Sequence, residues 1–298
     1  IFFRLMDQLF LPTDPNATYR HRGAAFEQLF QKVPALSSFY FKGEAEYQPD
    51  PVQAWMAARP LLPIIVCTLY VVLVFAGRKI MENKKPFGLR PLLILWNGSL
   101  SLFSIIGAIR TVPHLLYLLS TESFADTMCV SPVGHWGVGA TGFWVQMFIL
   151  SKFPELGDTV FIVLKKKPLL FLHWYHHVTV LLFCWHSYVT ESASGLYFVS
   201  MNYSVHGIMY GYYALMTARV PMKWFPSELL TLLQIAQMVV GVVVVSYSWY
   251  SASLPGYTCS NDMNNLYAGA VMYSSYFLLF VHFFVDKYIL KSRRPKKE

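Results

Sequence analysis

Three histidines lie within one turn of a predicted helix, in the stretch His173-Trp174-Tyr175-His176-His177. The spacing i, i+3, i+4 places all three imidazoles on one helix face. The surrounding segment, from Leu169 to Tyr188, is apolar and long enough to cross a bilayer. Ionisable groups at membrane depth are costly and usually line a cavity where they have a function. A single histidine could be a buried structural residue, whereas three on one face favour a reactive site.

Polar side chains recur at helical spacing in three other apolar segments, so that each set shares one helix face. These residues are Lys152, Glu155 and Asp158 in one segment, Asn202, His206, Tyr210 and Tyr213 in the next, and Gln234 and Gln237 in the last. At a rise of 1.5 Å per residue, the polar groups lie about 8 to 15 Å from the basic ends of their segments. One site open to that side explains this shared depth better than four unrelated inclusions.

Each set also has a purely structural explanation. The alternatives are a buried ion pair for Lys152 and Glu155, interhelical hydrogen bonds for Gln234 and Gln237, and simple packing for Tyr210 and Tyr213. His206 is harder to explain in this way because it lies in the middle of its segment, between Asn202 and Tyr210. We expect an interfacial position for His186 and structural roles for His114, His135 and His282.

Two kinds of chemistry suit clustered imidazoles. Histidines at this spacing can share a metal ion, but a membrane di-iron oxygenase needs several histidine boxes. This chain has nine histidines in scattered positions and no second box. Alternatively, a neutral imidazole can attack a thioester, and the acyl-imidazole stays activated for the next nucleophile. Polar neighbours would then orient the ring and hold developing oxyanions. We favour the second chemistry and expect no metal.

The composition is that of a membrane protein. Of 298 residues 55% are apolar and 13% charged, and the mean hydropathy is +0.41, whereas a soluble domain carries roughly 25% charged residues. Seven apolar runs are long enough to span a bilayer. They are Leu61 to Ile80, Leu92 to Ile109, Gly137 to Leu164, Leu169 to Tyr188, Leu196 to Met216, Leu229 to Trp249 and Tyr267 to Leu290. These runs predict an all-α integral membrane protein with seven transmembrane helices.

Three regions follow from this pattern. Residues 59–290 form the catalytic membrane domain. Residues 1–58 are expected to be a lumenal or interfacial segment, lying on the surface, partly amphipathic and loose near Pro49-Asp50-Pro51. Residues 291–298 form a basic cytosolic tail, whose last residues only approximate a dilysine retrieval signal and so point weakly to the endoplasmic reticulum.

Basic residues indicate the orientation of the chain. Sixteen of the 24 Lys and Arg residues follow the first, third, fifth and seventh predicted spans. The loops after the other spans carry the acidic residues Glu122, Asp126, Glu191 and Asp262. Because cytosolic loops are enriched in Lys and Arg, the C-terminus is predicted to be cytosolic and the N-terminus lumenal. The net charge of +8 is thereby explained without a nucleic acid partner.

Two lumenal modifications agree with this orientation. Cys129 and Cys259 lie in two different non-cytosolic loops, where oxidation is permitted, and we expect a disulfide between them. The alternative is a pair of free surface thiols. Asn16 begins a glycosylation sequon, Asn16-Ala17-Thr18, on the predicted lumenal side. Cys67 and Cys184 lie within spans and are interpreted as apolar packing residues.

The motifs together resemble one family, the fatty-acid elongases, which are the 3-oxoacyl-CoA synthases of the endoplasmic reticulum. The resemblance covers nearly all of the chain from about Leu61 onward. It rests on four motifs that match in order and spacing. They are Lys152-Phe-Pro-Glu155-Leu-Gly-Asp158-Thr159, His173-Trp-Tyr-His176-His177, Asn202-Tyr-Ser-Val-His206-Gly-Ile-Met-Tyr210-Gly-Tyr-Tyr213 and Thr231-Leu-Leu-Gln234-Ile-Ala-Gln237.

The resemblance implies seven helices, six of which surround a closed-ended acyl tunnel that opens to the cytosol. It also implies condensation of a long-chain acyl-CoA with malonyl-CoA, yielding 3-oxoacyl-CoA, carbon dioxide and CoA, without metal or dissociable cofactor. By carry-over, His176 accepts the acyl group and His206 assists the malonyl step. His173 and His177 orient and polarise, with Asn202 and Gln237 as polar partners. Reductases and a dehydratase of the elongation cycle are the implied protein partners.

Lys165, Lys166, Lys167 and the tail cations are our own candidates for holding the CoA phosphates.

The histidine box is followed by Val178-Thr-Val-Leu-Leu, which is similar to the branch acting on saturated and monounsaturated chains. Polyunsaturated-chain members tend to carry Gln five residues before the box, where this chain has Pro168. The alternative functions for the whole protein are a membrane di-iron lipid oxygenase or desaturase, and a non-enzymatic seven-span receptor or lipid carrier.

Overall fold

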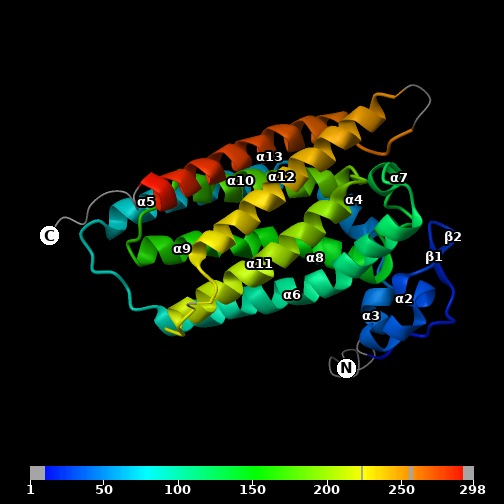
Figure 1. The fold of residues 1–298 in the computed structure, drawn as a ribbon, viewed down its shortest axis with the longest axis horizontal. Coiled ribbons are helices and arrows are strands. Elements are labelled where there is room, and N and C mark those ends of the chain that lie inside the picture. Colours follow the sequence, from blue (N-terminus) through cyan, green and yellow to red (C-terminus); the bar gives the residue numbers. More distant parts are fainter. Residues whose placement is uncertain (1–10, 223, 255–257, 291–298) are drawn as a thin grey trace.

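Long helices running side by side dominate the computed structural model, which describes residues 11–222, 224–254 and 258–290 (Figure 1). These helices are α5 (Leu62–Met81), α6 (Arg90–Thr121), α8 (Gly139–Glu155), α9 (Gly157–Leu164), α10 (Phe171–Val189), α11 (Gly195–Thr217), α12 (Ser227–Ala252) and α13 (Met263–Phe284). A π-helical turn, Val285–Leu290, continues α13. Four of the helices are long and apolar enough to cross a membrane: α5, α6, α12 and α13 with its extension.

Each of the seven predicted segments coincides with one helix or, for the third, with the pair α8 and α9. The third segment breaks at Leu156, just after Pro154, which lacks an amide proton for the helical ladder. Gly157 then opens α9 against the ring of Trp96, where an added Cβ would lie 2.9 Å from the nearest ring atom. Close contact with this ring therefore requires glycine at the start of α9.

The predicted end of the second segment at Ile109 is wrong, since α6 continues to Thr121. Its continuation contains Arg110 and His114, which lower the hydropathy of the sequence. Both side chains are buried and have partners, because Arg110 pairs with Glu44 and His114 bonds to Thr141 Oγ1 at 2.7 Å. These partners lie outside the segment, so a local hydropathy scan does not detect them.

Helices α6 and α11 approach closely in the middle of the bundle. Gly107 lies directly against the ring of Tyr203, where a Cβ would come within 2.3 Å of a ring atom. The hydroxyl of Tyr203 donates to the carbonyl of Trp144 in α8, at 2.9 Å. Small residues let membrane helices pack backbone to side chain in this way. This contact fixes α11, which carries Asn202 and His206, against α6 and α8.

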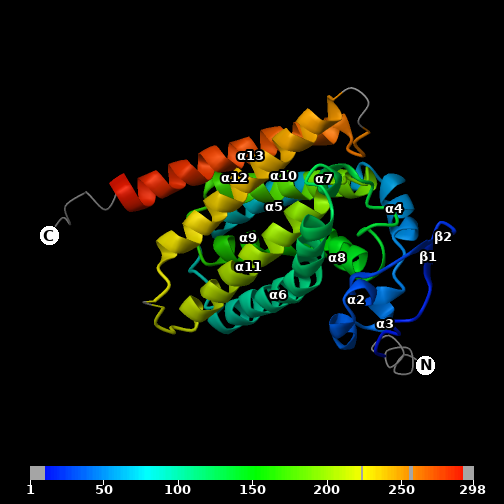
Figure 2. The same cartoon turned by 45° about the vertical axis from the view of Figure 1, so that its right-hand side comes forward.

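The N-terminal segment folds as a small cap at the end of the bundle opposite the π-helical extension of α13 (Figures 1 and 2). It contains the antiparallel strands β1 (Tyr19–His21) and β2 (Ala24–Phe26), helices α2 (Leu29–Lys32), α3 (Lys42–Ala45) and α4 (Asp50–Ala57), and a 3-10 turn, Pro34–Phe39. The all-α prediction therefore missed one hairpin, which is local to this cap.

The expected looseness near Pro49-Asp50-Pro51 is also wrong, because α4 begins there. Proline suits a first helical turn, since its φ is preset and its missing amide proton would have no intrahelical acceptor. The Asp50 carboxylate is held by His21 Nε2 and by Arg22 NH2, each at 2.7 Å. These contacts tie the start of α4 to the hairpin.

Buried polar contacts dock the cap onto the bundle, so this segment is more than a surface-lying stretch. Glu44 of α3 pairs with Arg110 of α6 at 3.0 Å, and both side chains are buried. Trp144 Nε1 donates to the same carboxylate at 2.7 Å. Arg110 also donates to the carbonyl of Phe39 at 2.6 Å. A buried ion pair is tolerated when such additional hydrogen bonds satisfy it.

Cys129 and Cys259 are joined in the structure, with an S–S distance of 2.09 Å. Cys129 ends the short helix α7 (Asp126–Cys129), and Cys259 lies between α12 and α13. The backbone amide of Ser260 donates to the carbonyl of Cys129 at 2.8 Å. This link joins the loop after α6 to the loop before α13, at the cap end of the bundle. The predicted basic tail, residues 291–298, lies outside the described residues, as do residues 1–10 of the N-terminal segment.

Candidate active site

A cavity of about 600 Å³, here called the main cavity, lies among the long helices. Side chains of α6, α9, α10, α11, α12 and α13 line it, whereas α5, which the structure describes throughout, contributes none. Lys165, Lys167 and Thr217 line one end, where α9 and α11 terminate. This is the end of the bundle that carries the basic loops.

The main cavity brings together most of the residues singled out from the sequence. Those that line it are His173, His176, His177, His206, Asp158, Asn202, Tyr210, Tyr213, Gln234, Gln237, Lys165 and Lys167. Lys152, Glu155 and Lys166 do not line it. Lys166 instead donates to the backbone carbonyls of Glu82 and Lys84, at 2.9 and 3.0 Å. Two of the three candidate lysines therefore line this cavity.

The three histidines of the box do share one face of α10. The ring centroids of His173 and His177 are 4.6 Å apart, and those of His176 and His177 are 5.5 Å apart. His206 projects from α11 into the same cavity. Imidazoles from two helices thus line one cavity, which their similar depths in the sequence predicted.

Tyr276 of α13 positions the backbone and ring of His176. Its hydroxyl donates to the His176 carbonyl at 3.1 Å and lies 2.5 Å from Thr179 Oγ1. The rings of Tyr276 and His176 are in contact, with centroids 5.0 Å apart. Tyr276 is almost completely buried, so this contact fixes the turn of α10 that carries the middle histidine.

An ion pair lies directly behind the main cavity. Lys152 Nζ donates to both carboxylate oxygens of Glu155, at 2.8 and 2.9 Å, and to Asn202 Oδ1 at 3.3 Å. Ser151 Oγ donates to Glu155 at 2.7 Å, and His206 Nδ1 lies 3.9 Å from the same carboxylate. The pair therefore bonds to one cavity residue, Asn202, and lies beside a second, His206, so that packing and function need not be alternatives.

Asp158 acts as an acceptor for two side chains. Trp96 Nε1 and the Tyr210 hydroxyl each donate to its carboxylate at 2.6 Å. The ring of Tyr210 in turn contacts that of His206, with centroids 5.3 Å apart. Asp158 thus holds Tyr210 in place beside the histidine, and its oxygens are already engaged.

The glutamines of α12 complete the wall. Gln234 Nε2 lies 3.2 Å from the sulfur of Met209, and Gln237 is buried at the cavity. Among the described residues, no group of three or more His, Cys, Asp or Glu side chains is placed to hold a metal ion.

Sequence reasoning gave no role to several residues that contact this site. Trp96, Ser151, Thr159 and Tyr276 bond directly to Asp158, Glu155, His173 and the backbone of His176, respectively. Thr159 stood inside a quoted motif, which was the one available signal. Trp96 and Tyr276 had none, because a buried aromatic residue and a lipid-facing one look alike in an apolar span.

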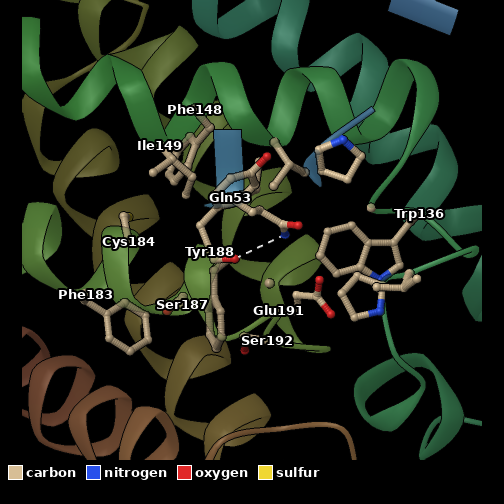
Figure 3. Close-up of a pocket in the computed structure, with 18 residues that line it drawn as sticks. Gln53, Trp136, Phe148, Ile149, Phe183, Cys184, Ser187, Tyr188, Glu191 and Ser192 are labelled. Carbon is tan, nitrogen blue, oxygen red and sulfur yellow. Dashed lines mark hydrogen bonds between the residues drawn. The ribbon is translucent and has the colours of Figure 1, made fainter. Parts of the chain in front are cut away.

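A smaller pocket of about 60 Å³, here called the distal pocket, is shown in Figure 3, and Pro49 and Gln53 of the cap are among its lining residues. Phe148 and Ile149 of α8 and Phe183 and Cys184 of α10 line it, and Gln53 of α4 donates to the Tyr188 carbonyl at 3.4 Å. Cys184 follows His177 by seven residues, or about 10 Å along the helix. The distal pocket therefore continues the direction of the main cavity into the bundle.

The comparisons with known proteins agree on one family. The sequence profile of ELO, described as the GNS1/SUR4 family, matches residues 55–296. The chain is 41% identical over 274 residues to very long chain fatty acid elongase 6 of Gallus gallus, covering 89% of this chain and 98% of that protein. For the elongase of the same name from Drosophila melanogaster, identity is 41% over 264 residues, covering 86% and 83%. For that of Homo sapiens it is 40% over 269 residues, covering 89% and 98%. The chain therefore belongs to the ELO family of fatty-acid elongases.

Proposed function

We propose that this elongase condenses a long-chain acyl-CoA with malonyl-CoA through an acyl-imidazole formed on His176. The products are 3-oxoacyl-CoA, carbon dioxide and CoA. The supporting observation is that His176 and His206, from two helices, line one cavity that reaches the basic end of the bundle. Such a cavity can take a thioester at its mouth and an acyl chain in its interior.

In the first step, an unprotonated ring nitrogen of His176 attacks the thioester carbonyl. The N–acyl bond forms, the C–S bond breaks, and CoA leaves with the proton that the imidazole loses. His173 and His177 flank the nucleophile and can polarise the carbonyl. Donors placed where negative charge develops lower the barrier of such a step.

In the second step, malonyl-CoA loses carbon dioxide and becomes an enolate. Its carbon attacks the acyl-imidazole carbonyl, the new C–C bond forms, and the N–acyl bond breaks. One proton from solvent restores the imidazole. His206 and Asn202 hold the enolate oxygen, and the Lys152–Glu155 pair keeps both side chains in position.

The same proposal assigns substrate contacts along the cavity. Lys165 and Lys167 hold the CoA phosphates at the mouth, whereas the tail cations lie outside the described residues. Tyr213, Gln234 and Gln237 contact the substrate between mouth and histidines. The acyl chain, saturated or monounsaturated, runs past the histidines toward the distal pocket.

We further propose that all seven helical units cross the membrane of the endoplasmic reticulum. The N-terminal cap is then lumenal and the C-terminus cytosolic, because the basic loops lie at the opposite end of the bundle from the cap. The Cys129–Cys259 link and Asn16, which is exposed, would both lie on the lumenal side. Reductases and a dehydratase would take over the 3-oxoacyl product.

Mass spectrometry of the intact protein and of its peptides tests the mechanism. After exposure to palmitoyl-CoA without malonyl-CoA, we expect an acyl mass on a peptide that contains His176. The His176→Ala variant should form no adduct and release no CoA. His186→Gln is the matched control, because His186 is on the same helix but bonds to Asn265 away from the cavity. Full turnover by His176→Ala would refute the acyl-imidazole.

A further inference from the structure

Side chains from three helices form a chain of hydrogen bonds that ends on His173. The hydroxyl of Tyr70 in α5 lies 2.7 Å from Thr159 Oγ1 in α9. Thr159 Oγ1 in turn lies 2.9 Å from His173 Nε2 in α10. Thr159 is fully buried and Tyr70 is 7% exposed, so bulk water does not compete for these groups. Although α5 contributes no wall to the main cavity, it reaches the histidine box through this chain.

Burial determines which way the protons point. Thr159 is the one hydrogen-bond partner that the described residues offer to the Tyr70 hydroxyl. A buried hydroxyl that donates to nothing is costly, so Tyr70 donates to Thr159. Thr159 then accepts from Tyr70, and His173 Nε2 is the one acceptor that the described residues offer to the buried Thr159 proton. That nitrogen is therefore an acceptor, and the neutral ring carries its proton on Nδ1.

We propose that Tyr70 and Thr159 are positioning residues that hold His173 in the tautomer protonated on Nδ1. His173 lines the main cavity with the other histidines of the box, so this tautomer offers the cavity an N–H donor. The donor serves the carbonyl oxygen of the acyl group as negative charge develops on it. This role rests on the proposed function, because it needs an acyl group beside His176.

The surroundings allow the chain to be broken without emptying space. Tyr70 belongs to an apolar cluster with Val74 and Val163, and its ring centroid lies 6.4 Å from that of His177. Tyr70→Phe therefore removes one proton donor and keeps the packing. Thr159→Val keeps the shape of the side chain and removes the hydroxyl, whereas Thr159→Ser keeps the hydroxyl.

A second hydroxyl pair provides a matched control. Tyr197 in α11 bonds to Thr127 Oγ1 at 2.6 Å, and both residues are buried. This pair has the same chemistry as Tyr70 and Thr159 but no histidine at its end. Tyr197→Phe therefore measures what loss of a buried tyrosine hydroxyl does to the fold alone.

The test compares kcat and KM for palmitoyl-CoA among these variants of the full chain. Removing an oxyanion donor outright costs roughly 100-fold to 1,000-fold in kcat. We expect a fall of about 10-fold to 100-fold for Tyr70→Phe and Thr159→Val, since the donor tautomer becomes less populated but is not abolished. KM should change less than kcat. Thr159→Ser should retain most of the wild-type kcat, and Tyr197→Phe should leave kcat unchanged.

Nitrogen-15 NMR of histidine-labelled protein reads the tautomer directly. The His173 signals are identified by their loss in His173→Gln. Wild-type protein should show Nδ1 protonated and Nε2 bare, and Tyr70→Phe should show a mixture. An Nε2-protonated ring in the wild type, or unchanged kcat in both disrupting variants of an active enzyme, would overturn the inference. If the wild-type protein condenses nothing, the proposed function fails, whereas the NMR result still decides the tautomer.

Discussion

Lys152 Nζ lies 2.8 Å from Glu155 Oε1, and neither side chain is more than 4% exposed. Charges at this depth are tolerated only when they are paired and further hydrogen-bonded. Ser151 supplies one such bond to Glu155, and Asn202 accepts one from Lys152. The ion pair therefore links the packing of α8 to the position of a cavity residue on α11.

We expect Lys152→Met to destabilise the protein by about 3 to 5 kcal/mol, because Glu155 is left buried without its counter-ion. The double variant Lys152→Met/Glu155→Gln should recover much of this loss, since no uncompensated charge remains. The double variant should still condense its substrates slowly, because Asn202 loses the hydrogen bond from Lys152 and His206 loses the carboxylate beside it. Thermal unfolding in detergent and condensation assays on both variants measure the two effects. A double variant as unstable as the single one would contradict the assignment.

The sequence was sufficient to predict the helices and the shared face of the histidines. Apolar runs of this length fold as helices in a membrane, and the helical period then fixes which side chains align. The convergence of His176 and His206 on one cavity followed from their similar depths. Each of these properties depends on the pattern within one segment, so a local pattern in the sequence is enough to predict it.

The features that the sequence did not reveal depend on partners distant in the chain. Arg110 and Glu44 are 66 residues apart, and Tyr70 and Thr159 are 89 residues apart. Neither contact leaves a local pattern, so the helix was ended too early at Ile109 and the chain from Tyr70 to His173 was not found. The cap was missed for the same reason, since its short elements are stabilised by docking to the bundle.

Cys184 lines the distal pocket, so a larger side chain at this position should shorten the acyl chain of the product. We expect Cys184→Phe to occupy most of the roughly 60 Å³ of this pocket and to block the last carbons of the acyl chain. Turnover of short acyl-CoAs should be kept, while elongation of longer ones falls at least 10-fold. Mass spectrometry of the 3-oxoacyl products measures the distribution.

Cys67→Phe is the control for overpacking alone, which costs about 1 to 3 kcal/mol. Cys67 is buried in α5, with its thiol 3.7 Å from the Val178 carbonyl, and it does not line either cavity. An unchanged product distribution in Cys184→Phe, or the same shift in Cys67→Phe, would show that the distal pocket does not limit chain length.

The cap reaches the distal pocket through Pro49 and Gln53. Arg110→Met leaves the buried Glu44 carboxylate with hydrogen bonds from Trp144 Nε1 and the Phe41 backbone amide but without its counter-ion, a loss of about 3 to 5 kcal/mol in docking. Arg110→Lys keeps the charge but not the planar fork that bonds both Glu44 and Phe39, so its effect should be intermediate.

Limited proteolysis in detergent measures the docking. Arg20 and Arg22 lie in the hairpin, where trypsin should cut faster in the order Arg110→Met, Arg110→Lys, wild type. Because α4 also forms one wall of the distal pocket, undocking should open that pocket and lengthen the product that Cys184→Phe shortens. Equal cleavage rates in all three proteins would mean that the buried ion pair does not hold the cap. Faster cleavage with an unchanged product would mean that the cap is held by the pair but does not close the acyl tunnel.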